Sequence, residues 1–561
     1  MTNRLVECVP NFSEGRDPAV IEQITNEIES VDGVRLLNVD PGRATNRTVV
    51  TFVGAPEPVC EAAFRAVKKA AELIDMSRHT GEHPRFGATD VCPLVPVAGI
   101  SMQETVKYAH GLAKRIGDEL DIGVYCYENA CRQEARRNLA ACREGEYEGL
   151  PTKLSNPEWK PDFGPAAFNA RSGVTAVGAR DCLVAYNITL NTTSTRRANA
   201  IAFDIREKGR KKREGGALTG PVVTDGAGQE QWIPGKLKCV KGIGWFTEEF
   251  GIAQVSLNLT NLSVTPVHVA FDEACKAAES RGVRVTGSEL VGLIPLKAIL
   301  DAGRYFLKKQ NRSTGVADKE LVKIAVKSLG LDDLYPFKPE EKIIEYAIAD
   351  RGKKRLVDMT VQDFVCETAS ESPAPGGGSI AAAAGACGAA LATMVANLSS
   401  HKRGWDAHWE ECSDWAEKGK QHHDELLRLI DEDTDAFNGL MAAFGRSAGT
   451  EAEEREKLEA IEAATKRAIE IPFRVMEAAL ASMEVIAAMA ERGNPNSVSD
   501  AGVGALCART AAMGAFLNVK INAKDVKDRQ WIDDLVRRGE AIVAEAAAKE
   551  AQILEVVNSK I

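Results

Sequence analysis

A stretch of small, uncharged residues in the last third of the chain limits what this chain can fold into. Residues 372–400 read SPAPGGGSIAAAAGACGAALATMVANLSS, without one charged side chain. Such a stretch can be a flexible linker, a membrane span, or a glycine-rich turn that begins a closely packed helix. Alanine favours helix too strongly for a disordered linker. Membrane insertion is favoured by Leu, Ile, Phe and Val rather than by Ala and Gly. We therefore expect a buried helix and no membrane span.

The start of this helix carries the first candidate binding residues. The hydroxyl of Ser379 suits an N-cap, so we expect the helix to begin there. Small residues at Gly385, Ala389 and Thr393 leave a groove in which a second helix backbone can come close. The preceding glycines let backbone amides face an anion, but the run lacks the Lys-Ser/Thr pair of a nucleotide-binding loop. The candidates for substrate binding here are Gly377, Gly378 and Ser379.

The first half of the chain alternates strand and helix patterns. The strands RLVECVP, VRLLNVD, NRTVVTFVG and ATDVCPLVPV and the helices AVIEQITNEIESV and PVCEAAFRAVKKAAELI follow the order β-α-β-β-α-β. A second copy of this order begins near Cys182. From Thr360 onward the patterns are long helices rich in Ala, Glu, Lys and Leu. The predicted fold class is therefore multidomain, with two tandem α+β (ferredoxin-like βαββαβ) subdomains followed by an all-α helical bundle.

Domain limits follow from these changes in pattern. We place the first subdomain at 1–181, the second at 182–348, a linker at 349–356 and the helical domain at 357–561. A Gly/Pro-rich surface loop is expected at 214–236. It follows the basic run REKGRKKREGG, which either attracts a polyglutamate tail or is a solvated charged loop.

Charge and cysteine content exclude some classes of function. A net charge of -10 argues against general nucleic-acid binding, which needs a basic face for phosphates. Thirteen cysteines without a paired framework fit reduced thiols in a cytoplasmic protein. The N-terminal residues MTNRLVECVPNFSEG contain no apolar run long enough for a signal peptide.

The densest polar cluster lies in MSRHTGEHPRFGATDVCP. His79, Glu82 and His83 match the spacing H-x-x-E-H of an inverted zinc-protease motif. That motif needs a helix to bring both histidines to one face, and Gly81 and Pro84 oppose a helix here. We therefore expect no metal site.

Acid–base catalysis and carboxylate binding are the other possible roles of this region. A histidine on a loop at the end of a sheet suits general acid–base catalysis, because its pKa lies near neutrality. Alternatively, both histidines bond loop carbonyls. Asn46, Arg47 and Arg85 are candidates for binding a substrate carboxylate, since arginine binds carboxylates with bidentate geometry. Either arginine could equally form a surface ion pair.

A second candidate catalytic residue lies on the helix DELLRLIDEDTDAFNGLMAAF. Its apolar face runs through Leu426, Ile430, Phe437, Leu440 and Phe444. The same spacing puts Asp433 on that face, whereas Asp431 and Asp435 fall outside it and are expected to be solvated. Burial of a carboxyl raises its pKa and makes it a usable acid near neutral pH. The alternative role of Asp433 is a hydrogen bond between helices.

The N-terminal half resembles the formiminotransferase domain of the formimidoyltransferase-cyclodeaminase family. The resemblance is carried by LVECVPNFSEGR, TNRTVVTFVG, DMSRHTGEHPRFGATDVCP, WKPDFGP, GARDCLVAYNITL, KGIGW and GSELVGLIPLKAIL, and it covers nearly all of residues 1–348. It implies N-formimino-L-glutamate and tetrahydrofolate as substrates and places the catalytic histidine at His83. It places the folate-binding segment at Gly164, Pro165, Ala166, Ala167, Phe168, Asn169, Ala170, Arg171, Ser172 and Gly173.

The C-terminal part resembles the cyclodeaminase domain of the same family. SPAPGGGSIAAAAGACGAALATMV, LIDEDTDAF and SDAGVGALCARTAAMGAFLNVKIN carry this resemblance over about 357–561. It implies closure of 5-formiminotetrahydrofolate to 5,10-methenyltetrahydrofolate with release of ammonia, and it places the proton donor at Asp433. It also implies a ring-like homo-oligomer, with an octamer as one expected size, and a polyglutamylated tetrahydrofolate co-substrate. Weaker candidates for the pterin site are Asn494, Asp500, Asn518 and Asn522, although Asp500 can instead cap its helix.

The function predicted from the sequence is therefore a bifunctional folate enzyme of histidine degradation, a transferase and an ammonia lyase. Two alternatives remain open. One keeps the folds but changes the reaction to formyl transfer or methenyl-folate hydrolysis. The other is a non-catalytic folate-binding or scaffold protein.

Overall fold

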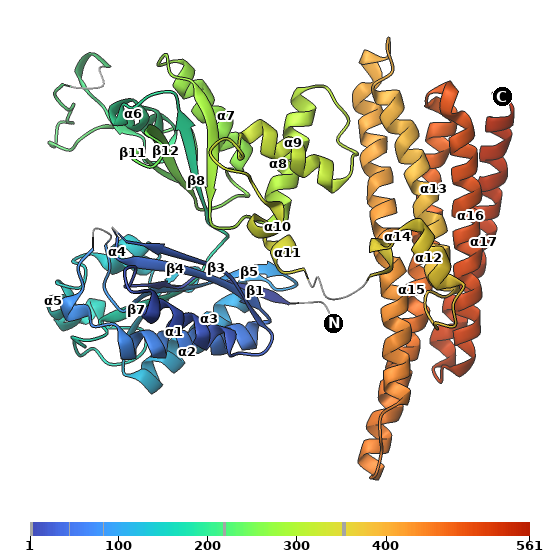
Figure 1. Ribbon diagram of the computed structural model, residues 1–561, viewed down its shortest axis with the longest axis horizontal. Coiled ribbons are helices and arrows are strands. Elements are labelled where there is room, and N and C mark those ends of the chain that lie inside the picture. The colour runs from blue at the N-terminus through green and yellow to red at the C-terminus, as the bar shows by residue number, and fades with distance from the viewer. Residues whose placement is uncertain (1–3, 44, 82–83, 217–219, 350–354) are drawn as a thin grey trace. The chain divides into compact units, whose positions relative to one another are not determined.

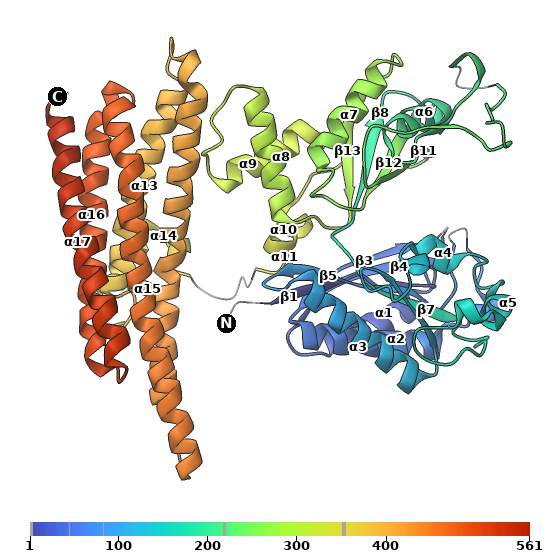
Figure 2. The ribbon, with the colours of Figure 1, turned by 180° about the vertical axis from the view of Figure 1, so that it is seen from behind.

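The computed structural model describes residues 4–43, 45–81, 84–216, 220–349 and 355–561. It divides into two compact units, the first formed by Met1–Ala302 with Ala325–Ala349 and the second by Gly303–Ile324 with Asp350–Ile561. Within the described residues, the first unit mixes strands and helices and the second is helical (Figures 1 and 2). The predicted change from α+β to helical architecture is confirmed.

A seven-stranded sheet forms the first half of the first unit. β1, β4, β2, β5, β7 and β6 lie side by side in that order, and β3 pairs with β4. β5, β7 and β6 are mutually parallel, and the other pairs are antiparallel. The strands are β1 (Leu5–Cys8), β2 (Asn11–Phe12), β3 (Val34–Gly42), β4 (Arg47–Gly54), β5 (Thr89–Ala98), β6 (Gly123–Glu128) and β7 (Val174–Ala179).

Three long helices cover one face of this sheet (Figure 1). They are α1 (Pro18–Glu29), α2 (Pro56–Leu73) and α3 (Met102–Leu120). Because side chains alternate along a strand, Val6, Cys8 and Phe52 pack into the core beneath these helices. Their odd-numbered neighbours on the same strands point to the opposite, open face. That open face forms one wall of a cleft.

Short elements border the open end of the sheet, namely the 3₁₀ turn at Met76–Arg78, α4 (Leu139–Arg143) and α5 (Leu150–Ser155). Arg136 anchors this region from inside, because the residue is 1% exposed and its guanidinium bonds Asp162 at 2.7 Å. The same guanidinium donates to the carbonyls of Glu158 and Lys160. The irregular chain around α4 and α5 is thereby held against the sheet.

A four-stranded antiparallel sheet forms the second half of the first unit. Its elements follow the order β8 (Val184–Leu190), α6 (Thr195–Ile205), β11 (Val240–Thr247), β12 (Ile252–Leu259), α7 (Val267–Glu279) and β13 (Val285–Val291). The strands lie side by side as β11-β12-β8-β13. The expected loop at 214–236 carries β10 (Trp232–Ile233), which pairs with β9 (Arg210–Lys211). Part of the basic run is internally paired, Arg210 with Asp204 and Lys211 with Glu230.

The chain then continues through α8 (Leu296–Lys309), α9 (Asp318–Leu329), α10 (Pro339–Lys342) and α11 (Ile344–Ala347). The helices of the second unit are α12 (Val361–Thr368), α13 (Gly377–Ser400), α14 (Trp409–Phe444), α15 (Glu451–Arg492), α16 (Val498–Asn522) and α17 (Arg529–Asn558). The uncharged stretch is α13, and it packs against α14 and α16. A methyl group added at Gly385 would come within 2.9 Å of the Ala511 Cβ, so the predicted close helix approach is confirmed.

One segment of the middle of the chain belongs to the helical unit. Residues 303–324 pack with it rather than with the sheet that precedes them. The Thr314 amide donates to the Ser413 hydroxyl at 3.1 Å, and the Asn397 side chain donates to the Gly315 carbonyl at 2.8 Å. A Cβ on Gly315 would lie 2.3 Å from the Ala416 backbone, so the segment lies directly on α14.

Three local expectations are corrected. Ser379 does not cap α13, because the helix begins at Gly377 with Gly376 as its N-cap. Asp431 is not fully solvated, because it accepts a hydrogen bond from the Leu356 amide at 2.7 Å. The apolar face of α14 does not stay buried to its end, since Phe444 is 50% exposed where α14 and α15 extend past the other helices (Figures 1 and 2).

Candidate functional site

The first candidate site begins at the loop between α2 and β5. The expected catalytic histidine, His83, lies outside the described residues, as does Glu82. His79, on the same loop, is half-buried and fixed at both ring nitrogens. Its Nδ1 accepts from Arg85 Nε at 3.2 Å, and its Nε2 lies 2.9 Å from the Asn46 carbonyl oxygen. Burial lowers the pKa of His79, so the neutral ring is favoured.

Asn46 connects this loop to the turn before β4. Its backbone is left-handed, with φ of 48°, a conformation that asparagine tolerates better than most residues. Its side chain accepts from the Gly15 amide at 3.0 Å and donates to the Thr80 carbonyl at 3.0 Å. Asn46 therefore joins three chain segments beside the loop.

Arg85, the second carboxylate-binding candidate, is engaged by protein carboxylates in this structure. Its guanidinium donates to both oxygens of Glu148, at 2.9 and 2.8 Å, and to Glu146 at 3.2 Å. The hydrogen bond to Glu148 is the main reason that the pKa of Arg85 is raised. The geometry makes Arg85 a brace between the His79 loop and the turn at 146–148.

The segment Gly164–Gly173 lies against the same loop. Its backbone carbonyls accept from both ends of the loop, Arg171 from the Met76 amide at 2.9 Å and Ser172 from the Ala88 amide at 2.8 Å. Phe168 is 39% exposed, and its ring lies 5.5 Å from that of Tyr147. An exposed aromatic ring beside a polar loop can stack on a flat heterocycle. The structure thus brings together Asn46, Arg85 and the segment expected to bind folate.

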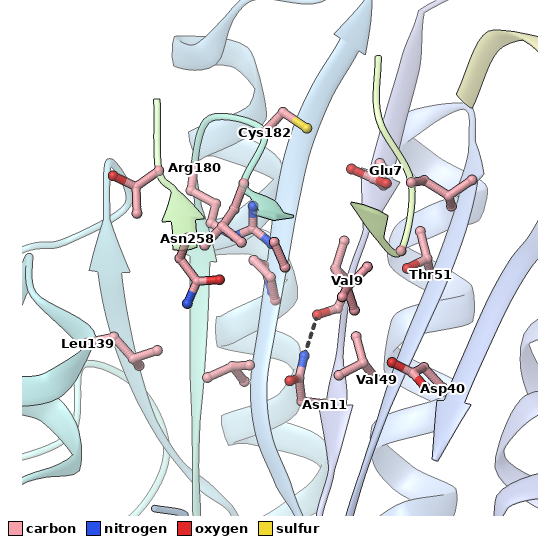
Figure 3. Close-up of a pocket in the computed structure, with 18 of the residues that line it drawn as sticks. Glu7, Val9, Asn11, Asp40, Val49, Thr51, Leu139, Arg180, Cys182 and Asn258 are labelled. Carbon is pink, nitrogen blue, oxygen red and sulfur yellow. Dashed lines mark hydrogen bonds between the residues drawn. The ribbon is translucent and has the colours of Figure 1, made fainter. Parts of the chain in front are cut away.

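A cleft of 390 Å³ opens over the uncovered face of the first sheet (Figure 3). One wall of the cleft includes Glu7, Val9 and Asn11, which are alternate residues along the chain. The strand ends of the second sheet supply the other wall. The cleft is lined by Glu7, Val9, Asn11, Asn38, Asp40, Arg47, Val49, Thr51, Val91, Pro93, Tyr127, Leu139, Arg143, Arg180, Cys182, Leu183, Ala185, Lys241, Asn258, Thr260, Val291, Gly292 and Leu293.

Glu7 is the most perturbed acid of this cleft. It is 5% exposed on a central strand, and burial raises its pKa to about 7, against the opposing effect of Arg180. Figure 3 shows its carboxyl and Cys182 at one end of the cleft and Asn11 toward the other. A carboxyl of this kind can hold or release a proton near neutral pH.

Arg47, the third carboxylate-binding candidate, lies at the Asn11 end of the cleft. Its Nε donates to the Asn11 side-chain oxygen at 3.0 Å, and its Nη1 donates to Asp90 at 2.5 Å. Arg143 also binds Asp90, through Nη2 at 2.5 Å. Arg143 comes from the short helix α4, far from Arg47 in sequence, and sequence reasoning missed it. The alternation Glu7-Val9-Asn11 in VECVPN was the available signal for the open face.

The second candidate site lies in the helical unit, where α14 passes the start of α13. The Ser379 hydroxyl donates to Asp433 Oδ2 at 2.9 Å and also contacts the Ile430 carbonyl at 3.2 Å. Burial raises the pKa of Asp433, and the hydrogen bonds from Ser379 only partly oppose that rise. A Cβ on Gly378 would lie 2.3 Å from Asp433 Oδ1, so the carboxyl rests directly on the backbone of α13.

The other polar candidates of the helical unit divide into two groups. Asn518 lies beside this site, because a Cβ on Gly377 would be 3.1 Å from its side-chain nitrogen. Asn522 is occupied by a hydrogen bond to the Ala468 carbonyl at 3.1 Å. The backbone amide of Asn494 instead donates to the Ser399 hydroxyl near the other end of α13, and Asp500 lies in the first turn of α16. Twenty residues of helix put that end about 30 Å from Ser379, so Asn494 and Asp500 do not reach Asp433 within one chain.

Two helices, Gly377–Ser400 and Pro495–Asn522, are long and apolar enough to cross a membrane by length and composition alone. Their most apolar windows are 61% and 50% buried inside the protein, and core helices of a bundle pass the same test. Within the ranges that the structure describes, no cluster of three or more His, Cys, Asp or Glu residues could hold a metal ion.

Comparisons with known proteins cover nearly the whole chain. Three family models match in series: "Formiminotransferase domain, N-terminal subdomain" at 5–180, "Formiminotransferase domain" at 185–349 and "Formiminotransferase-cyclodeaminase" at 360–541. Formimidoyltransferase-cyclodeaminase of Gallus gallus is 43% identical over 99% of both chains. Glutamate formimidoyltransferase of Streptococcus pyogenes is 41% identical over 55% of this chain and 95% of its own length. Methenyltetrahydrofolate cyclohydrolase of Methylorubrum extorquens is 35% identical over 36% of this chain and 97% of its own.

Proposed function

The chain belongs to the formimidoyltransferase-cyclodeaminase family, and we propose from this premise that it is a bifunctional folate enzyme of histidine degradation. It transfers the formimino group of N-formimino-L-glutamate to tetrahydrofolate. It then cyclises 5-formiminotetrahydrofolate to 5,10-methenyltetrahydrofolate and releases ammonia. The observation that carries the proposal is the 43% identity to a bifunctional relative over 99% of both chains.

The first reaction needs a group that moves one proton in each direction. The 5-nitrogen of tetrahydrofolate loses a proton as it attacks the formimino carbon, and the glutamate nitrogen gains one as its bond to that carbon breaks. We assign both transfers to the imidazole of His83. The assignment is supported by the surroundings of the loop, because Asn46, Arg85 and Gly164–Gly173 fix the described residues on either side of it.

The second reaction needs an acid. The 10-nitrogen of the folate loses its proton as it forms a bond to the formimino carbon, and the double bond from that carbon to its terminal =NH nitrogen breaks. That nitrogen takes up two protons, the one lost by the 10-nitrogen and one from the acid, and leaves as ammonia. Asp433 is suited to supply this proton, because burial keeps its carboxyl neutral to higher pH than usual. Gly378 lies against Asp433, and the adjacent Gly377 lies against Asn518; we assign the pterin to this side of α13.

Separate assays of the two steps test the assignment of two sites. His83→Ala is expected to abolish formimino transfer while cyclisation of supplied 5-formiminotetrahydrofolate continues. Asp433→Asn is expected to do the reverse. Transfer is followed as glutamate release, and cyclisation as methenyl-folate absorbance together with ammonia. Loss of both activities in either well-folded variant would contradict the assignment.

A second candidate activity applies to the helical unit alone. Hydrolysis of methenyltetrahydrofolate is favoured by the 35% identity to the cyclohydrolase from Methylorubrum extorquens, which this part of the chain covers almost completely. Supplying 5,10-methenyltetrahydrofolate and following the loss of its absorbance distinguishes cyclohydrolase from cyclodeaminase activity. The cyclodeaminase assignment predicts ammonia release from the formimino substrate and no enzyme-dependent acceleration of this hydrolysis.

An exposed apolar face on α13 and α16 supports self-association. α13 and α16 pack against each other, but exposed large apolar side chains recur along both helices. They are Ile380, Met394, Leu398, Val503, Leu506, Met513, Leu517 and Ile521. We propose that this face binds a second copy of the chain within a ring-like homo-oligomer, with an octamer as the expected size. Such a contact would also bring residues of a second chain toward Asp433.

The remaining features of the proposal concern fold and environment. We propose that the half containing β8, α6, β11, β12, α7 and β13 is ferredoxin-like, as its element order and strand neighbours suggest. We further propose a cytoplasmic enzyme, in keeping with thirteen cysteines that are all free thiols. Tetrahydrofolate, polyglutamylated in the cell, is its co-substrate, and no metal takes part.

A further inference from the structure

Two arginines share one buried carboxylate at the Asn11 end of the cleft. Asp90 is fully buried and accepts from Arg47 Nη1 and Arg143 Nη2, both at 2.5 Å. It also accepts from Arg143 Nε at 3.3 Å and from the Phe86 amide at 3.2 Å. Arg47 is 7% exposed, and the side chain of Arg143 is 16% exposed. All the charges of this cluster are therefore largely removed from water.

The cluster carries an excess of positive charge. Two guanidinium groups face one carboxylate, and arginine stays protonated in proteins. Burial lowers the pKa of Arg47, and the nearby Arg143 lowers it further, against the favourable effect of Asp90. A buried charge without a partner costs free energy. An anion entering the cleft would remove this imbalance.

The other charged groups that line the cleft do not cancel the excess of positive charge. Glu7 has a pKa of about 7, so much of it is neutral at physiological pH, and Asp40 is exposed to solvent. Arg180 and Lys241 add two further cations to the cleft wall. The cleft as a whole therefore favours a ligand with negative charge.

Each arginine of the cluster also has a terminal nitrogen whose N–H groups are not bonded to the protein residues described. Arg47 uses Nη1 and Nε, and Arg143 uses Nη2 and Nε. Among the described residues, no acceptor bonds Arg47 Nη2 or Arg143 Nη1. Both arginines line the cleft, so their spare N–H₂ groups are available to a second carboxylate.

We propose that the Arg47–Asp90–Arg143 cluster anchors a carboxylate of the formimino donor, N-formimino-L-glutamate. This inference rests on the proposed transferase function. The donor is favoured over folate because no residue of Gly164–Gly173, the expected folate segment, lines the cleft. The donor also carries two carboxylates, and Arg180 and Lys241 on the cleft wall are available for the second. Asp90 is a positioning residue that orients both guanidinium groups.

Steady-state kinetics of Arg143→Met in the full chain test this proposal. The variant leaves Arg47 and Asp90 as a neutral pair, so the fold is expected to survive, which thermal unfolding checks. Loss of charge-assisted hydrogen bonds to a carboxylate raises the KM for the formimino donor by roughly 10- to 100-fold. The KM for tetrahydrofolate is expected to change less than about twofold. Arg143→Lys restores the charge but not the fork geometry, so its KM should fall between the two.

A matched control and a second readout separate binding from structure. Arg137→Met removes an exposed arginine that pairs with Glu134 outside the cleft, and it should leave both KM values unchanged. Glutarate, used as a dicarboxylate probe, should raise the unfolding midpoint of the first unit in the wild type but not in Arg143→Met. An unchanged donor KM, or a rise in the folate KM instead, would overturn the proposal. Absence of any formimino transfer in the wild type would refute the proposed function, while the glutarate measurement would still decide whether this cluster binds carboxylates.

Discussion

Replacing Gly378 by alanine should separate the two activities with one methyl group. The new Cβ would lie 2.3 Å from Asp433 Oδ1, 2.6 Å from its Cγ and 2.7 Å from Oδ2. Ordinary carbon–oxygen contact needs well over 3 Å, so the carboxyl must move by about 1 Å, and a displacement of that size can reduce catalysis by about 100-fold. The hydrogen bond from Ser379 at 2.9 Å would be lost or distorted by the same movement.

The stability of the Gly378→Ala variant should change much less than its activity. Alanine is favoured over glycine inside a helix by about 1 kcal/mol, and the crowding at Asp433 costs about 1–3 kcal/mol. The net loss is thus about 0–2 kcal/mol, which leaves the helical unit folded. Urea unfolding followed by circular dichroism measures this difference directly.

The assay supplies 5-formiminotetrahydrofolate and follows methenyl-folate absorbance and ammonia, with formimino transfer measured in parallel. Gly376→Ala is the matched control, because a Cβ there meets nothing within 4 Å and its φ of -100° suits alanine. We expect cyclisation to fall by about 100-fold in Gly378→Ala alone, with transfer unchanged in both variants. Cyclisation within threefold of wild type in Gly378→Ala would refute the placement of Asp433 as the proton donor.

Three further predictions concern stability and assembly. The stability that protonated Glu7 contributes is fully present below its unfolded pKa of 4.5 and is lost as pH rises through about 7. Glu7→Gln should therefore become the more stable protein between pH 5 and 8, by on the order of 3 kcal/mol at most. A difference in urea unfolding that does not depend on pH would contradict this. Arg136→Met leaves the buried Asp162 carboxylate without its cation and should lower the free energy of unfolding, measured by calorimetry, by about 3–5 kcal/mol. The double variant Arg136→Met with Asp162→Asn should recover much of this loss. Leu517→Lys, on the exposed face of α16, should reduce the mass found by light scattering, whereas Ile243→Lys, at a similarly exposed position of the first unit, should not.

Periodic patterns within single elements predicted much of this architecture. The strands and helices that were predicted in the first unit lie close to their expected positions, because alternation and helical spacing are local properties of the sequence. α3, β6 and β7 were not predicted, and they extend the first sheet beyond the expected βαββαβ order. The burial of Asp433 was predicted by the same reasoning, since its position on one helix face decides whether it is buried. Ser379 was misplaced as a cap because the helix starts earlier, at Gly377. Its hydroxyl serves instead as a donor to Asp433 on another helix, and spacing along α13 contains no information about that contact.

The charged cleft shows where such reasoning stops. Arg47 was a candidate, but its partners come from separate elements, Asp90 from β5 and Arg143 from α4. α4 is five residues long and has no period that could show which face is buried. Only the pairing of β1, β4 and β5 in one sheet brings Glu7, Arg47 and Asp90 together. Burial that depends on several distant segments cannot be read from any one of them.

The docking of residues 303–324 on α14 sets a condition on how this chain can be divided. A cut after Ala349 would separate the matched family regions cleanly in sequence but would leave this segment on the wrong fragment. The isolated helical fragment would then expose Ser413 and Asn397, which bond Thr314 and Gly315 in the intact chain. The two enzymes of this chain are therefore interleaved rather than joined end to end, and a working split would need to return residues 303–324 to the helical fragment in trans.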